Sequence, residues 1–163
     1  MASWNWLNPA SAQPRLNQAP ACCGAAASAL GRLNDDGSGA LAKGLADADP
    51  GVTLASLASI SRINSFSGVS SIAALTGNAS VSVRRRALEV LDALDASDSV
   101  DVVAAAAKND TDAGVRAAAC HALGTFGAAT SGDAGAMTIL QNLAKNDADT
   151  FVRDQAQIAL QRL

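Results

Sequence analysis

The chain has 163 residues, of which 49% are hydrophobic and 3% aromatic, and it carries a formal net charge of −3. This length favours a single domain, and the apolar share is sufficient for a continuous core. The acidic balance argues against a general polyanion-binding protein, and there is no apolar run of about 18 residues that would span a membrane.

The first twenty residues differ from the rest of the chain. They hold both tryptophans, Trp4 and Trp6, and three of the four prolines, and they show no helical period. We therefore expect residues 1–20 to form an extended N-terminal arm, with no secretory signal. Alternate residues of an extended segment project to the same side, and tryptophan is common at interface hot spots. Trp4 and Trp6 are thus predicted to anchor a partner or another copy; the alternative is that the arm covers the chain's own first helix.

A pattern repeats through residues 21–163. Four copies begin at Val52, Val83, Val115 and Val152, and a shorter one begins at Cys22, with spacings of 30, 31, 32 and 37 residues. Each valine is followed by a small residue at offset 4 and by large apolar residues at offsets 8 and 11. These offsets lie on one stripe of an α-helix, so each copy predicts a helix with one apolar face. A fixed period in this range is typical of a solenoid.

Each repeated helix has a second helix upstream of it. The residue three positions before each valine is Asp49, Ser80, Asp112 or Asp149, and all four side chains can cap a helix N-terminus. An apolar stretch long enough for two to three turns precedes each cap. Each unit is therefore predicted to be a helix pair joined by a short acidic turn, giving an all-α chain of about nine main helices.

The residues of the repeat select one family of solenoids. The string Asp-x-x-Val-Arg-x-x-Ala-x-x-Ala-Leu is matched by Asp112, Val115, Arg116, Ala119, Ala122 and Leu123, and again by Asp149, Val152, Arg153, Ala156, Ala159 and Leu160. The unit at Val52 departs, with Thr53 in place of arginine. This string resembles the short HEAT-like repeat of the kind found in phycocyanobilin lyases. The resemblance implies a right-handed α-solenoid of about four and a half HEAT-like helix pairs over residues 21–163.

The arginines suggest two roles. Arg84, Arg116 and Arg153 occupy one column of the repeat, where each guanidinium can reach the acidic turn of a neighbouring unit. We predict a ladder of ion pairs, with ligand binding as the alternative. Arg84, Arg85 and Arg86 are consecutive, so in a helix they fan around the circumference and cannot form one phosphate-binding face. They are predicted to be solvated or to meet a partner's acidic patch, and with the tryptophans they form the candidate partner-binding set.

The sequence offers no catalytic or metal-binding constellation. Cys22, Cys23 and Cys120 are predicted to be small buried hydrophobes in a reduced compartment. His121 follows Cys120 directly, and adjacent helical residues point about 100° apart, which argues against a Cys-His dyad. The Asp-x-Asp turns lack the further oxygens and the bidentate glutamate of a calcium site, so capping is the better interpretation. We therefore expect no catalytic residue, cofactor or metal.

These features predict a non-enzymatic protein-interaction or structural subunit of a larger assembly, in the cytoplasm or within an assembled particle. A virion or similar particle would suit a small, Ala/Ser-rich, arm-bearing chain. The alternative, implied only by the resemblance, is a bilin-lyase-like or chaperone-like protein acting on a tetrapyrrole-bearing partner. A third possibility is a HEAT-like DNA-repair glycosylase, against which the acidic balance and the few aromatics count.

Overall fold

The computed structural model describes residues 38–63, 66–129 and 134–163, and every regular element within these ranges is a helix. The α-helices are α2 (Ser38–Leu45), α3 (Pro50–Ile60), α4 (Val69–Ala74), α5 (Val81–Ala93), α6 (Val100–Asn109), α7 (Ala113–Ala129), α8 (Ala134–Asn146) and α9 (Thr150–Leu160). Two short 3-10 helices, η2 (Leu75–Gly77) and η3 (Ser97–Ser99), lie between them. The predicted arm over residues 1–20 and the helix expected to start near Ala21 lie outside the described residues.

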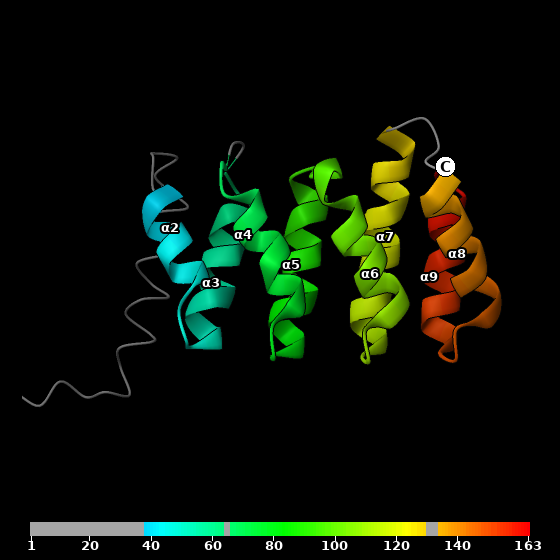
Figure 1. Cartoon of the computed structure of the whole chain (residues 1–163), viewed down its shortest axis with the longest axis horizontal. Coiled ribbons are helices and arrows are strands. Elements are labelled where there is room, and N and C mark those ends of the chain that lie inside the picture. The colour runs from blue at the N-terminus through cyan, green and yellow to red at the C-terminus, as the bar shows by residue number, and fades with distance from the viewer. Residues whose placement is uncertain (1–37, 64–65, 130–133) are drawn as a thin grey trace, which may run out of the picture.

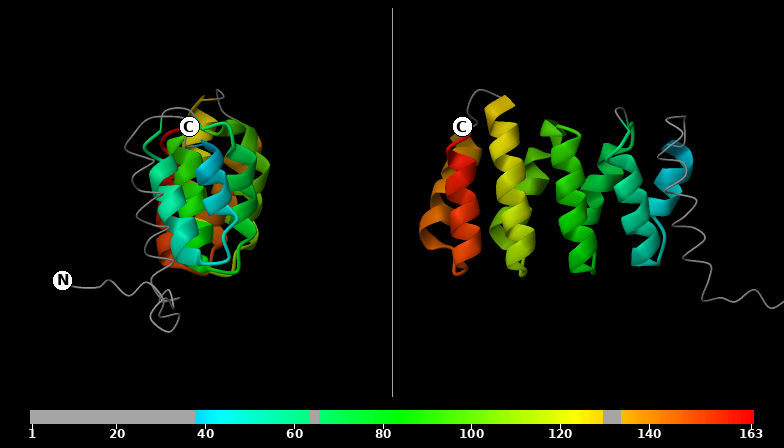
Figure 2. Two further views of the ribbon diagram at one scale, coloured as in Figure 1. Left: turned by 90° about the vertical axis from the view of Figure 1, so that its left-hand side faces the viewer. Right: turned by 180° about the vertical axis from the view of Figure 1, so that it is seen from behind.

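The helices pack as four consecutive pairs in two layers (Figure 1). The second helices of the pairs, α3, α5, α7 and α9, stand side by side in one layer, as the view from behind shows (Figure 2). The first helices, α2, α4, α6 and α8, form the other layer, and each contacts its own partner. The prediction of an all-α solenoid of stacked helix pairs is therefore confirmed.

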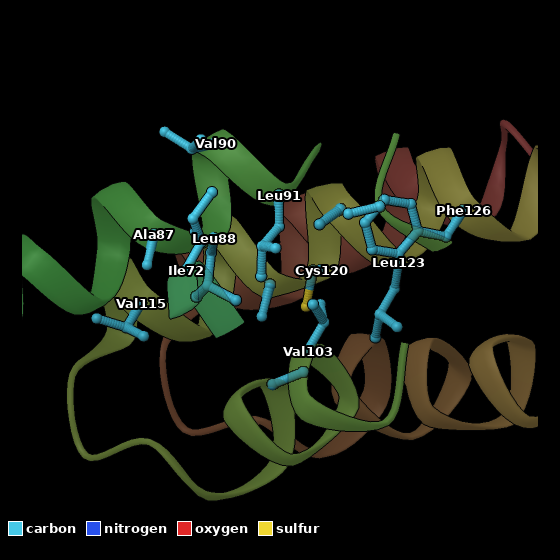
Figure 3. Close-up of a cluster of buried hydrophobic side chains, with 14 of the residues drawn as sticks. Ile72, Ala87, Leu88, Val90, Leu91, Val103, Val115, Cys120, Leu123 and Phe126 are labelled. Atoms are coloured by element: carbon cyan, nitrogen blue, oxygen red, sulfur yellow. The ribbon is translucent and has the colours of Figure 1, made fainter. Parts of the chain in front are cut away.

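The core lies between the layers and is built from the repeated stripe. Val83, Val115 and Val152 are fully buried, and the small residues four positions on are buried in every described unit. Figure 3 shows how Leu91 of α5, Val103 of α6 and Cys120 of α7 converge in one cluster. Because each stripe is covered only by adjacent helices, a unit is stabilised chiefly by its neighbours.

Small residues allow close approach where α7 meets α9. A Cβ added at Gly124 would lie 2.9 Å from the Cβ of Ala159 and 3.0 Å from its Cα. Gly127 faces Leu163 in the same way, one turn further along α7. The tight, thin packing expected from an alanine-rich chain is thus present at this interface, and a larger side chain at Gly124 would force the two helices apart.

The predicted N-caps are confirmed at three of four positions. Asp49 accepts from the backbone N–H of Gly51 at 2.7 Å, Asp149 from that of Phe151 at 2.8 Å, and Asp112 from that of Val115 at 3.0 Å. Ser80 occupies the N-cap position of α5 with extended backbone, but its hydroxyl makes no capping bond. The prediction of a side-chain cap is wrong there, and the turn is held instead by the N–H of Ser80, which donates to the side-chain oxygen of Asn78.

Candidate protein-interaction surface

A ladder of bidentate ion pairs runs along the turns that join the two helices of each pair. Arg84 donates from Nε and Nη2 to the two carboxylate oxygens of Asp110, at 2.7 and 2.9 Å. Arg116 binds Asp147 in the same way, at 2.9 and 2.8 Å. In both rungs Nη1 donates to a backbone carbonyl preceding the arginine's own helix. The predicted ladder is confirmed for these two arginines, each of which joins its unit to the next. Arg153, the third residue of the column, donates instead to two backbone carbonyls that precede its own helix.

The ladder residues are largely shielded from solvent. The side chains of Arg84 and Asp110 are 13% and 8% exposed, and those of Arg116 and Asp147 are 15% and 6% exposed. The hydrogen bonds from Arg84 and Arg116 hold the pKa values of Asp110 and Asp147 below the usual range, against the opposing effect of burial. Each carboxylate also accepts from the backbone N–H two residues on, which lowers its pKa further.

These lowered pKa values predict a specific acid sensitivity. A carboxyl group with a lower pKa in the folded state stabilises the fold above its unfolded-state pKa of about 4, and this contribution is lost as the pH falls through the lowered value. Asp110→Asn removes one such group, so its free energy of unfolding should depend less steeply on pH below about 4. Urea titrations across this range measure the slope; the exposed Asp101→Asn is the control, and identical slopes for the two variants would contradict the prediction.

The rung without an arginine lacks the partner carboxylate as well. Thr53 replaces the arginine and donates to the carbonyls of Asp47 and Asp49, each at 3.3 Å. At the turn that an arginine there would reach, Asn78 stands where the later units have an aspartate, and its side-chain oxygen accepts from the N–H of Ser80 at 2.8 Å. The departure at Thr53 therefore leaves no unpaired carboxylate at that turn.

The three consecutive arginines diverge, as the helical geometry predicted. Arg84 is held in the ladder, whereas Arg85 and Arg86 both approach Glu89 on α5, at 3.7 and 2.9 Å. Arg86 also donates to the hydroxyl of Ser61 at 3.3 Å. The structure thus brings Arg85 and Arg86 together on the surface and separates Arg84 from them. Trp4 and Trp6, the other predicted partner-binding residues, lie outside the described residues.

A groove crosses α7 between α5 and α9; we call it the α7 groove. Its volume is about 420 Å³, and its lining includes Arg85, Gly114, Ala117, Ala118, Phe151 and Gln155. Phe151 is 55% exposed, which is unusual for a phenylalanine. Sequence reasoning missed this residue, although a signal was present: the position directly before the repeated valine is small elsewhere, as at Ser82 and Gly114, whereas here it is a phenylalanine.

His121 links three successive units beside the α7 groove. Its Nδ1 lies 2.9 Å from Asp92 Oδ2 on α5, and its Nε2 lies 2.9 Å from Arg162 Nη1, just after α9. Because an arginine only donates, Nε2 acts as the acceptor in the contact with Arg162. The preceding residue, Cys120, is fully buried, and burial raises the pKa of its thiol to about 12. Cys120 is therefore the inert core residue that was predicted.

The aspartates of the acidic turns are engaged in contacts within the chain. In the last two turns the first aspartate binds an arginine, while the second caps a helix. Within the described ranges no cluster of three or more His, Cys, Asp or Glu side chains could hold a metal ion. Nor is any helix in that part of the chain long and apolar enough to cross a membrane.

This protein is an α-solenoid built from repeats. Its helix pairs are stacked, ion pairs join successive units, and the second helices form one continuous layer. Residues 68–161, more than half of the chain, match the family model of HEAT repeats, and the chain belongs to that family. No curated protein matches the sequence. The matched region runs from the start of α4 to the end of α9, and the pair α2–α3, which lacks the ladder arginine, lies before it. HEAT repeats generally mediate protein–protein interaction.

Proposed function

We propose that this chain is a non-catalytic interaction subunit of a larger assembly, acting in the cytoplasm or within the assembled particle. It binds protein partners, or further copies of itself, through the face of the second-helix layer and through the arm over residues 1–20. The observation that carries the proposal is an exposed apolar side chain on this layer in a family that binds proteins: Phe151 of α9 is 55% exposed, and Ile158, two turns further on, is 42% exposed.

The ladder supports this role because it pre-organises the face. Two bidentate arginine–carboxylate pairs fix the positions of three successive units relative to one another. A surface whose geometry is set before binding loses less conformational entropy when a partner docks. The arm adds a second contact, and two linked contacts bind more tightly than either alone.

The arm can be tested by its own fluorescence. The chain has two tryptophans, Trp4 and Trp6, and no tyrosine, so the tryptophan emission of the full chain reports on the arm alone. Association with the native partner, or between copies at high concentration, should shift this emission to shorter wavelength as the indoles leave water. The variant Trp4→Ala/Trp6→Ala should keep the helical circular dichroism and the denaturation midpoint, yet lose assembly.

The controls separate an anchoring arm from a folding one. A pull-down from the native source compares the full chain with the double tryptophan variant, and recovery of the same partners by both would sink the anchoring role. A clearly lower midpoint for the variant would show that the tryptophans cover the chain's own first helix. Light scattering of the assembled species tests for a virion-like or similar particle. Mixing with a bilin tests the lyase-like alternative, for which we expect no change in the bilin absorbance.

A further inference from the structure

The α7 groove combines a smooth apolar floor with raised walls. The floor comes from Gly114, Ala117 and Ala118 of α7, none of which extends beyond a Cβ atom. One wall is Phe151 of α9, a residue that is more than half exposed, and the opposite wall is Arg85 of α5. A Cβ added at Gly114 would lie 3.9 Å from Arg85 Nη1. The guanidinium therefore lies close to the floor at the N-terminal end of α7. The floor can therefore accept a flat or branched apolar side chain.

The wall at α5 carries two arginines, Arg85 and Arg86, that share one carboxylate. The carboxylate of Glu89 pairs with both arginines, and it lies closer to Arg86, at 2.9 Å, than to Arg85, at 3.7 Å. The Arg85 side chain is 56% exposed, compared with 34% for Arg86. The other carboxylate at the groove, Asp92, accepts from His121 through Oδ2, and its Oδ1 is buried. Arg85 is thus the group best placed to take a carboxylate from outside the chain.

We infer that the α7 groove is the partner-binding site of the solenoid, and that it takes a linear protein segment in which an aromatic or branched aliphatic side chain stands next to an aspartate or glutamate. The apolar side chain lies on Ala117 and Ala118 against Phe151, and the carboxylate accepts from Arg85. Neighbouring helices pack about 8–10 Å apart, so α5 to α9 spans roughly 20 Å, the length of about six extended residues. This inference rests on the proposed function.

The charge of the groove favours this occupant over two others. Residues 1–20 contain no aspartate or glutamate, so the chain's own arm cannot neutralise Arg85. Nucleic acid binding draws on several phosphate contacts with Lys and Arg side chains. The groove lining has one arginine, Arg85, and its two carboxylates, Glu89 and Asp92, are engaged by Arg86 and His121. An acidic-apolar protein segment meets both the positive charge and the apolar floor.

The test selects binders from a displayed library of random linear peptides on the immobilised full chain. Enriched peptides should pair an aromatic or branched aliphatic residue with Asp or Glu. Fluorescence anisotropy then measures the Kd of one synthesised binder. Phe151→Ser and Arg85→Glu should each weaken binding roughly tenfold or more, as expected when an interface anchor is lost. Met137→Ser and Lys108→Glu, matched changes at exposed positions of α8 and α6, should leave the Kd unchanged.

The inference would be overturned by no enriched peptide, by a basic consensus, by binders indifferent to Phe151 and Arg85, or by displacement of the binder by single-stranded oligothymidylate. Displacement by a synthetic peptide of residues 1–20 would also overturn it, because the arm would then be the occupant. Circular dichroism confirms that each variant is folded. The proposed function fails separately: if the native-source pull-down shows no partner while selected peptides still require Phe151 and Arg85, only the biological role is lost.

Discussion

Replacing Leu123 with alanine is expected to lower the free energy of unfolding by about 2–5 kcal/mol. Leu123 is fully buried in the core cluster, on the longest helix of the described chain. The stripe that it belongs to is covered from both sides, since α7 packs against α5 and α9 as well as against α6. The cavity left by the truncation therefore weakens contacts with more than one unit, and the loss should lie well above the effect of a surface change.

Urea denaturation of the full chain measures this loss, and Val102→Ala on α6 is the control. Val102 is 36% exposed, so its truncation should cost well under about 1 kcal/mol. His121, two residues before Leu123, is a less suitable control because it hydrogen-bonds both Asp92 and Arg162. Equal shifts of the denaturation midpoint for Leu123→Ala and Val102→Ala would show that the repeat alignment is wrong.

The second large effect is expected in the ladder. Arg116→Thr should cost about 2–4 kcal/mol, because it leaves the carboxylate of Asp147 shielded from water without its cation. The side chain of Asp147 is only 6% exposed, and after the substitution its carboxylate still accepts from the backbone N–H of Asp149. The substitution also removes the bond from Arg116 Nη1 to the carbonyl of Asp110.

An uncharged rung that occurs naturally in this chain provides the matched control for Arg116→Thr. The earlier rung has Thr53 and Asn78 at the corresponding positions, so Arg116→Thr/Asp147→Asn reproduces a natural rung in a later unit. The double variant should be more stable than the sum of the two single losses predicts, with a coupling energy of about 1–3 kcal/mol. Urea denaturation of all four proteins closes this cycle, and strictly additive losses would mean that the pair contributes no specific stability.

The fold and the ladder were predictable because they depend on short-range patterns that repeat. The valine column and its offsets place one apolar stripe on each helix, and that stripe can be buried only by stacking units. Arg84 and Arg116 follow the valine at the same offset, and Asp110 and Asp147 occupy the same turn position, so one reading of the repeat predicts both rungs. The departure at Thr53 was also visible in the sequence, whereas its correspondence with Asn78 was recognised only in the structure.

The candidate site depends instead on which side chains of different units become neighbours. Arg85 and Phe151 are far apart in sequence, and only the parallel arrangement of α5, α7 and α9 places them on opposite sides of one small-residue floor. The sharing of Glu89 by two arginines likewise depends on side-chain distances that a run of three arginines does not specify. A repeated pattern determines the period and the buried stripe, because those follow from the geometry of a single helix. The tertiary structure decides the exposed face, because its charge and shape arise where side chains from three different units meet.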